Sequence, residues 1–272
     1  MLPTVVKNLL IINGLMFAAQ IVAEKSFGIR LEDLLGLHYF ASQAFKPWQF
    51  VTYMFLHGDF GHLFFNMFAL WMFGYALENV WGPKRFLVYY FITGLGAALV
   101  HYLVVFIEIN PTVTLLNQLI ADPTVPGIFD FVTAHTLQIS QYSGDIYIQM
   151  QKFQNALETL SVNPDNREAM QTSINFLTDY REYYLNLPNV IGASGAVFGI
   201  LLAFGMIFPN TLIFIYFLFP IKAKYFVILY GAIELFYGFS GSGSNIAHFA
   251  HLGGMIFGFF LIRYWKKKGR LF

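Results

Sequence analysis

A serine and a histidine stand at the starts of two separate apolar segments of this chain. Ser194 lies in the Gly-Ala-Ser-Gly sequence of residues 192–195, before an apolar run that ends near Phe208, and His251 lies near the start of the last apolar run. A serine hydroxyl is a weak nucleophile until a base takes its proton, and neutral imidazole is the usual base near pH 7. The two residues therefore predict a nucleophile and its general base, each on its own hydrophobic helix.

Two further polar residues, His62 and Asn66, open another apolar run and are four positions apart. Residues four apart on a helix lie on the same face, so both side chains point at one volume. The first backbone N–H groups of a helix that begins at Ser194 have no intrahelical partner. These amides, with His62 and Asn66, are suited to holding the negative oxygen of a tetrahedral intermediate. Gly192 would let the backbone approach that oxygen closely.

The composition is that of a membrane protein. Of 272 residues, 57% are hydrophobic and only 11% are charged, whereas soluble domains carry about 25% charged residues. The net charge of +1 argues against a nucleic-acid partner. Without cysteine there is no disulfide, thiolate nucleophile or cysteine-ligated metal. We expect an all-α protein that crosses the lipid bilayer several times.

Six apolar runs are predicted to cross the membrane. They are Val5–Ala23, Phe60–Leu77, Phe86–Ile107, Ser194–Phe208, Tyr225–Phe239 and Ile246–Trp265. A cleaved signal peptide is the alternative for the first run, but the run is long for one and is followed by a poor cleavage site. Pro220, Lys222 and Lys224 interrupt the chain after the fourth run, which predicts a re-entrant or interfacial connector there.

Three parts follow along the chain. Residues 1–107 hold helices one to three with an outer loop at 24–49, residues 108–190 form an insertion, and residues 191–272 hold helices four to six and a basic tail. Within the insertion, apolar residues recur at helical spacing from Ile146 to Leu160, and Asn163-Pro164 breaks the pattern. We expect an extramembrane helical hairpin there. It is either a plain cap or a module that contacts a substrate, a partner or a second copy of the chain.

The distribution of basic residues predicts the orientation. With six helices, ten lysines and arginines fall on the side of both termini and three on the opposite short loops. By the positive-inside rule the termini are cytoplasmic and the insertion lies on the outer side. We expect a multi-pass protein of the bacterial inner (plasma) membrane.

Small residues predict how two of these helices meet. Gly195 and Gly199 on helix four, and Gly254 and Gly258 on helix six, form pairs spaced for close helix packing. The two halves of the serine–histidine pair should therefore come together. The Ser-Gly-Ser-Gly-Ser sequence of residues 240–244 is predicted to act as a hinge.

The order of these motifs resembles that of the rhomboid family of intramembrane serine proteases. The matching residues are Trp48-Gln49, His57, His62, Asn66, Leu77-Glu78, Trp81-Gly82, Gly192 to Gly195, and Ala247-His248 through Gly254. The resemblance implies a six-helix bundle that cleaves transmembrane substrates near their outer ends, with no metal or cofactor. It makes Ser194 the nucleophile, His251 the general base, and His62 and Asn66 the oxyanion donors.

The chain departs from the family pattern at two places. Gln49 stands where a Trp-Arg pair is common, so the way in which the neighbouring loop is anchored is left open. The insertion at 108–190 is the second departure, and it leaves open how a substrate reaches the site.

Several residues also have simpler interpretations. Ser194 could serve small-residue helix packing, and His251 could be an interhelical hydrogen bonder. His57 and His248 are more typical of structural histidines. Glu234, an acid well inside the fifth helix, could form a buried structural hydrogen bond or orient His251.

Rival functions are weaker. Four histidines (57, 62, 248 and 251) could ligate a metal or haem, which bound metal or a Soret band in the purified protein would support. Zinc metalloprotease chemistry is unsupported, because no HExxH motif is present. An α/β-hydrolase would need glycine where Ala196 stands. A catalytically inactive rhomboid-like chaperone or trafficking protein is the closest alternative, and such relatives typically lack the serine or the histidine. The sequence therefore predicts an intramembrane serine endopeptidase.

Overall fold

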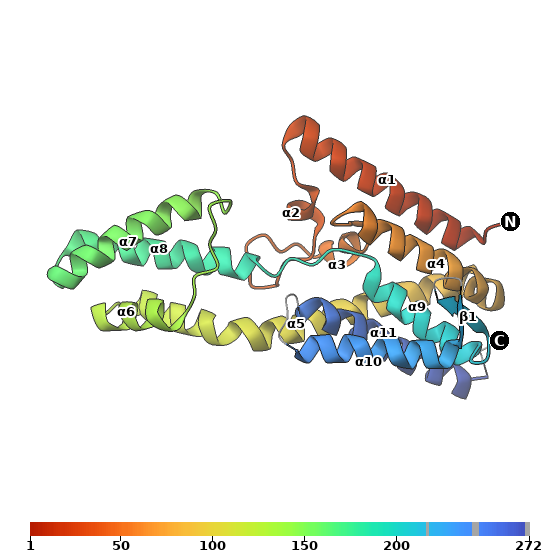
Figure 1. The fold of residues 1–272 in the computed structure, drawn as a ribbon. Coiled ribbons are helices and arrows are strands. Elements are labelled where there is room, and N and C mark those ends of the chain that lie inside the picture. Colours follow the sequence, from red (N-terminus) through yellow and green to blue (C-terminus); the bar gives the residue numbers. More distant parts are fainter. Residues whose placement is uncertain (216–217, 241–244, 270–272) are drawn as a thin grey trace. The chain divides into compact units, whose positions relative to one another are not determined.

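The protein is built almost entirely from helices. The structure, a computed structural model, describes residues 1–215, 218–240 and 245–269. Its elements, most of them labelled in Figure 1, are α1 (Thr4–Phe27), α2 (Leu31–Leu35), α3 (Gln49–Thr52), a 3-10 turn (Tyr53–Phe55), α4 (Phe60–Trp81), α5 (Pro83–Ala121), α6 (Val125–Ala134), α7 (Asp145–Val162), α8 (Arg167–Asn186), α9 (Ser194–Ile207), β1 (Leu212–Ile215), β2 (Phe219–Lys222), α10 (Ala223–Phe239) and α11 (Asn245–Lys267).

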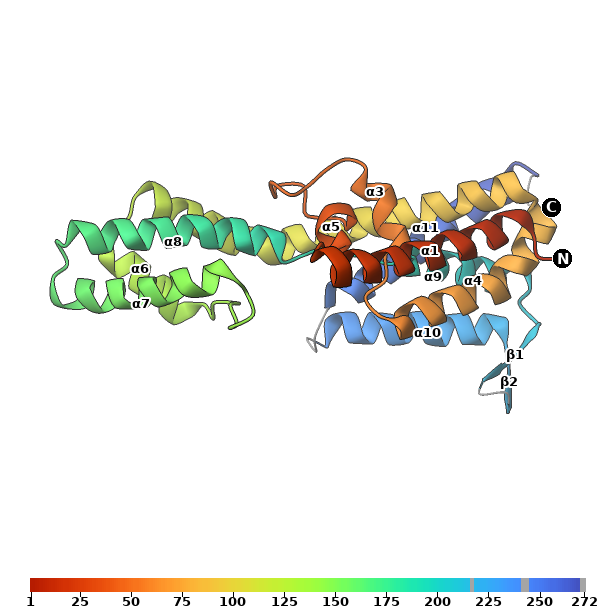
Figure 2. The same ribbon diagram turned by 90° about the horizontal axis from the view of Figure 1, so that it is seen from above.

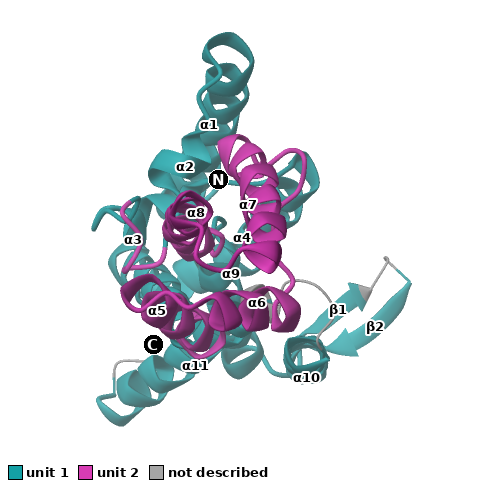
Figure 3. Cartoon of the chain, turned by 90° about the vertical axis from the view of Figure 1, so that its left-hand side faces the viewer, with its two compact units in different colours: residues 1–38, 44–104, 189–272 teal, residues 39–43, 105–188 magenta. Residues whose placement is uncertain are grey.

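The chain divides into two compact units, coloured separately in Figure 3. Unit 1 comprises residues 1–38, 44–104 and 189–272, and unit 2 comprises residues 39–43 and 105–188. Each has its own apolar core. In unit 1 the core is formed largely by α1, α4, the first part of α5, α9, α10 and α11. In unit 2 it is formed by the end of α5 with α6, α7 and α8.

Among the described residues, three helices, α1, α4 and α5, are long and apolar enough to cross a membrane by length and composition, and α9 is a shorter apolar helix. Their sequences, together with the helical architecture, confirm an all-α integral membrane protein. The count of six membrane crossings stays a prediction.

The third helix is longer than predicted. It was expected to end at Ile107, but α5 continues through Pro111 to Ala121. Proline removes one backbone hydrogen bond from a helix. Beyond it, Leu116 and Leu119 bury their side chains in the core of unit 2, which favours the continued helix. The helix α6 follows, capped by the Thr124 hydroxyl, and was not predicted.

The helical hairpin predicted within residues 145–185 is confirmed as α7 and α8, which pack side by side in Figure 1. Phe153 and Phe176 stack between them, with ring centroids 4.2 Å apart. The Asn166 side chain accepts a hydrogen bond from Ala169 N and so caps the start of α8.

The connector before α10 is a β-hairpin, which the sequence did not predict. Strands β1 and β2 pair antiparallel, with Leu212 opposite Lys222 and Phe214 opposite Pro220. A two-stranded ribbon leaves one edge of each strand unpaired, so a proline is tolerated in it. Figure 2 shows the hairpin projecting beside the start of α10. The predicted hinge at 240–244 lies, apart from Ser240, outside the described residues.

The glycines of α9 and α11 do not all meet as predicted. A Cβ atom added to Gly254 would lie 1.8 Å from the Gly195 carbonyl oxygen, so α9 and α11 are in backbone contact there. Gly199, however, faces Thr93 of α5, and Gly258 faces Tyr89 of the same helix. The predicted pairing of Gly199 with helix six is therefore wrong, because α5 lies against both of these glycines.

Gln49 anchors the loop whose attachment the sequence left in question. Its side chain is fully buried. The amide nitrogen donates to the carbonyl oxygens of Leu34 and Ala44, at 3.3 and 3.0 Å. The amide oxygen accepts from Lys46 N at 3.0 Å and from His38 N at 3.4 Å. A neutral side chain thus ties together the two ends of this loop.

Candidate active site

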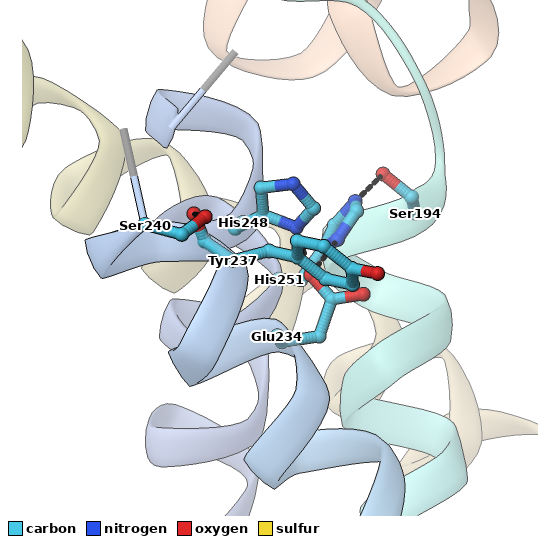
Figure 4. Close-up of polar contacts among 6 residues, drawn as sticks. All are labelled: Ser194, Glu234, Tyr237, Ser240, His248 and His251. Carbon is cyan, nitrogen blue, oxygen red and sulfur yellow. Dashed lines mark hydrogen bonds and ion pairs between the residues drawn. The ribbon is translucent and has the colours of Figure 1, made fainter. Parts of the chain in front are cut away.

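Ser194 and His251, the predicted nucleophile and base, are in hydrogen-bond contact. Ser194 is the first residue of α9, and His251 lies one turn further into α11 than His248. The distance from His251 Nε2 to Ser194 Oγ is 2.8 Å (Figure 4). Gly195 directly follows Ser194 and Gly254 lies one turn beyond His251, so the backbone contact between these two glycines sets the separation of the two helices at the site.

Glu234 of α10 contacts the other side of the His251 ring. His251 Nδ1 lies 2.9 Å from Glu234 Oε2. Because a carboxylate only accepts hydrogen bonds, the hydrogen sits on Nδ1 and leaves Nε2 as an acceptor facing Ser194. The Phe198 ring lies nearly parallel to the imidazole, with centroids 4.2 Å apart and planes 4° apart. His251 is therefore held by two hydrogen bonds and a stacking contact.

His248 contacts the same carboxylate oxygen. Its Nδ1 atom lies 2.7 Å from Glu234 Oε2, and its ring stacks on Tyr237 with centroids 5.6 Å apart (Figure 4). His248 and His251 are three residues apart on α11, so they share one helical face. Only 9% of the Glu234 side chain is exposed, against 25% for His248 and 20% for His251.

The start of α4 positions His62. Asp59 caps this helix, because its side chain accepts from His62 N at 2.8 Å. Gly58 N donates to His62 Nδ1 at 3.4 Å, which leaves Nε2 as the nitrogen that carries a hydrogen. His62 and Asn66 line the same cavity as Ser194, as their spacing predicted.

Gly192 lies directly beside the His62 ring. A Cβ atom at this position would be 2.8 Å from His62 Nε2, and the backbone angle φ is +125°. Few residues other than glycine adopt this angle. The amide of Gly192 donates to the Tyr53 carbonyl oxygen at 2.8 Å, which holds the segment leading into α9.

The site opens into a cavity of about 440 Å³ between α4, α9, α10 and α11. Its polar lining residues are Ser194, His251, His62, Asn66 and Tyr230, and most of the others are apolar. Such a cavity fits an apolar segment with one polar backbone bond directed at the serine.

Two other histidines are buried without a hydrogen-bond partner among the described residues. His57 contacts the His62 ring, with centroids 5.0 Å apart. Burial, and to a lesser extent the neighbouring His62, lowers the pKa of His57 to about 4. His101, to which the sequence assigned no role, borders a space of about 10 Å³ on the far side of Ser194.

The four-histidine metal site considered from sequence does not form as one cluster. Among the described residues, the ligand atoms that gather within 4.8 Å belong to Glu234, His248 and His251. His57 and His62 pair with each other instead. The sequence signal for this cluster was an intramembrane acid together with two histidines three apart.

Taken together, the fold and this geometry define a helical membrane protein with an apolar cavity that ends at a serine–histidine pair. Residues 44–109 and 169–268, more than half of the chain, match the family described as Rhomboid domain, and the chain belongs to this family. It is also similar to the Rhomboid protease AarA of Providencia stuartii, with 33% identity over 95 residues. That match covers 34% of this chain and 34% of the relative, so the chain spans about a third of the relative's length.

No solved structure matches the chain.

Proposed function

We propose that the protein is a serine endopeptidase that hydrolyses peptide bonds in or near the transmembrane segments of membrane proteins. The observation that carries the proposal is the 2.8 Å contact between Ser194 Oγ and His251 Nε2. Glu234 is the positioning residue, since its contact at 2.9 Å keeps the hydrogen on Nδ1 of His251.

In the first step, His251 Nε2 takes the hydroxyl proton while Ser194 Oγ bonds to the scissile carbonyl carbon. The protonated imidazole then gives that proton to the leaving amide nitrogen as the peptide bond breaks. A water molecule releases the acyl group from Ser194, with His251 again acting as base.

The negative oxygen of the intermediate needs donors. The N-cap residue of α9 is Ala193, which has no side-chain acceptor, so the first amides of the helix are left for a ligand. The His62 Nε2–H and the Asn66 amide can add side-chain donors, as both line the same cavity. Gly192 lets the backbone approach them.

The apolar cavity is proposed to receive the unwound end of a substrate helix, whose backbone would otherwise be unsatisfied in lipid. We further propose the bacterial inner (plasma) membrane, cytoplasmic termini, six crossings and an insertion on the outer side. The insertion at 108–190 is proposed as a cap or a partner-contacting module.

The test is labelling of the detergent-solubilised protein with a fluorophosphonate, which reacts with activated serines. Ser194→Ala and His251→Ala should abolish labelling, because one removes the nucleophile and the other its base. Ser140→Ala is the matched control, since Ser140 is exposed in unit 2 and should label as the wild type does.

A reporter substrate with one transmembrane segment, reconstituted with the protein in lipid, gives the second readout. We expect cleavage by the wild type and by Ser140→Ala only. A well-folded wild type that neither labels nor cleaves would favour the inactive chaperone or trafficking role instead.

A further inference from the structure

Glu234, His248 and His251 form a group whose ligand atoms converge on one point. Both Nδ1 atoms lie within 2.9 Å of the same oxygen, Glu234 Oε2. All three atoms lie within 4.8 Å of one another (Figure 4). Positioning His251 requires only one of these two imidazole contacts, so the serine–histidine chemistry leaves His248 without a role.

Two imidazoles and a carboxylate are the donors that zinc binds in sites with an open fourth position. Zinc bonds to these atoms are about 2.0–2.2 Å long, which places two tetrahedral ligands roughly 3.3 Å apart. The observed contacts of 2.7 and 2.9 Å are shorter than this by about half an ångström. Small side-chain rotations would therefore admit an ion between the three atoms.

The two imidazoles of the group are partly exposed, whereas the carboxylate is nearly buried. The His248 and His251 side chains are 25% and 20% exposed. His251 also lines the cavity that holds Ser194. An ion can thus reach the two imidazoles, while the carboxylate behind them supplies the charge that favours a cation.

We propose that Zn²⁺, or a divalent ion of similar ligand preference, binds Glu234, His248 and His251 and inhibits the protein. An ion on Nδ1 of His251 displaces the hydrogen from that nitrogen to solvent, and a hydrogen is taken up on Nε2. The imidazole stays neutral, so this exchange releases no net proton. Nε2 then carries a hydrogen toward Ser194 Oγ and cannot accept the serine proton.

The inhibitory consequence rests on the proposed serine chemistry, whereas the binding itself does not. Zn²⁺ binding is therefore measured by calorimetry on the detergent-solubilised full chain, both as wild type and as Ser194→Ala. We expect one ion per chain with the same affinity in both, because Ser194 supplies no ligand.

His248→Phe is the diagnostic variant, since it keeps a ring against Tyr237 but removes one ligand atom. Loss of a residue that only hydrogen-bonds to a metal ligand lowers metal affinity about 10- to 100-fold. Loss of a ligand itself should therefore lower the Zn²⁺ affinity by about 100-fold or more. His135→Phe, a histidine of unit 2 at the end of α6, is the control and should leave the affinity unchanged.

Fluorophosphonate labelling is then followed against Zn²⁺ concentration, each variant relative to its own metal-free rate. We expect wild-type labelling to fall over the range in which calorimetry shows binding, and to return with EDTA.

The same Zn²⁺ affinity in His248→Phe as in the wild type, or no saturable binding, would overturn the site. Binding without loss of labelling would overturn the inhibition. If the metal-free wild type does not label, the proposed function fails, and calorimetry still decides the metal site.

Discussion

At the scale of single residues, Glu234 determines how the His251 ring is oriented. Its carboxylate oxygen lies 2.9 Å from Nδ1, while the Phe198 ring covers one face of the imidazole. A lone imidazole could present either nitrogen to the serine. The carboxylate removes that choice, because it requires the hydrogen on the nitrogen that faces it.

Glu234→Gln tests this role. The amide can present an N–H group to His251 Nδ1, which would move the hydrogen to Nε2 and leave Ser194 without a base. We expect kcat for the reporter to fall by up to about 10⁴-fold, the loss found when the carboxylate of a serine-protease triad becomes an amide, with KM and the unfolding midpoint little changed. Glu24→Gln, an exposed acid in α1, should behave as wild type. An unchanged kcat would refute the assignment.

Gly192→Ala tests the close approach of the backbone to His62. The new Cβ would lie 2.8 Å from the imidazole, at a φ of +125°. We expect a loss of about 1–3 kcal/mol in stability from backbone strain, and loss of labelling because His62 is displaced. Gly28→Ala is the control: its φ is +65° and nothing lies within 4 Å of the new Cβ. Labelling should survive there, and equal effects of both variants would contradict the prediction.

His57 predicts a pH dependence of stability. Its pKa is lowered to about 4 in the folded chain, by burial first and then by His62, against the opposing Asp59 carboxylate. As the pH falls, the His57 imidazole therefore becomes protonated near pH 6.5 in the unfolded chain but only near pH 4 in the folded chain. The free energy of unfolding should fall by about 3 kcal/mol across this window. The measurement is the free energy of unfolding of the wild type and of His57→Leu at several pH values. If this free energy fell equally with pH in both proteins, His57 would not be its source.

At the scale of elements, the site depends on how closely α9 and α11 approach. The helices touch through backbone at Gly254 and Gly195, which lie one turn after His251 and directly after Ser194. Helix α5 supports them from the other side, where the Tyr89 hydroxyl donates to the Gly199 carbonyl oxygen at 2.8 Å. Three helices therefore share the positioning of Ser194.

Gly254→Ala should separate α9 from α11. The added Cβ would lie 1.8 Å from the Gly195 carbonyl oxygen, a backbone atom that cannot rotate away. We expect loss of fluorophosphonate labelling and a lower unfolding midpoint. Gly14→Ala in α1 is the matched control, because nothing lies within 4 Å of its Cβ. Removing a helical glycine there should stabilise by up to about 1 kcal/mol. Retained labelling in Gly254→Ala would disprove the packing argument.

At the scale of the whole molecule, each of the two units has an apolar core of its own. The core of unit 1 carries the site, whereas that of unit 2 is built around Phe153, Phe176 and Tyr180. Each core can in principle lose stability without the other, since core energetics depend on local packing.

Phe176→Ala should therefore destabilise α7 and α8 without reducing the reactivity of Ser194 toward the fluorophosphonate. Truncating a buried phenylalanine costs about 3–5 kcal/mol, which we expect to see as faster amide hydrogen exchange in these two helices. The labelling rate of Ser194 should stay at the wild-type value. Tyr142→Ala, at an exposed position of unit 2, should change neither measurement. A parallel loss of labelling in Phe176→Ala would show that the units are energetically coupled.

The amino-acid sequence by itself determined the protein class and the approximate helices, and it predicted four candidate site residues, Ser194, His251, His62 and Asn66. The class and helices follow from composition and from the length of apolar runs. Ser194 and His251 follow from their residue types at the starts of two such runs, and His62 and Asn66 from their spacing within one helix, all of which are local properties. The α7–α8 hairpin was predictable for the same reason, because its apolar face repeats at helical spacing.

Only the tertiary structure decided which faces of the membrane helices meet. Helix α9 is apolar all round, and such a helix carries no periodic signal of its rotation or its neighbours. Sequence therefore could not show that Gly199 faces α5, nor that His248 and His251 share one oxygen of Glu234, 14 and 17 residues away on another helix. Those contacts depend on how three apolar helices rotate against one another, which packing alone decides.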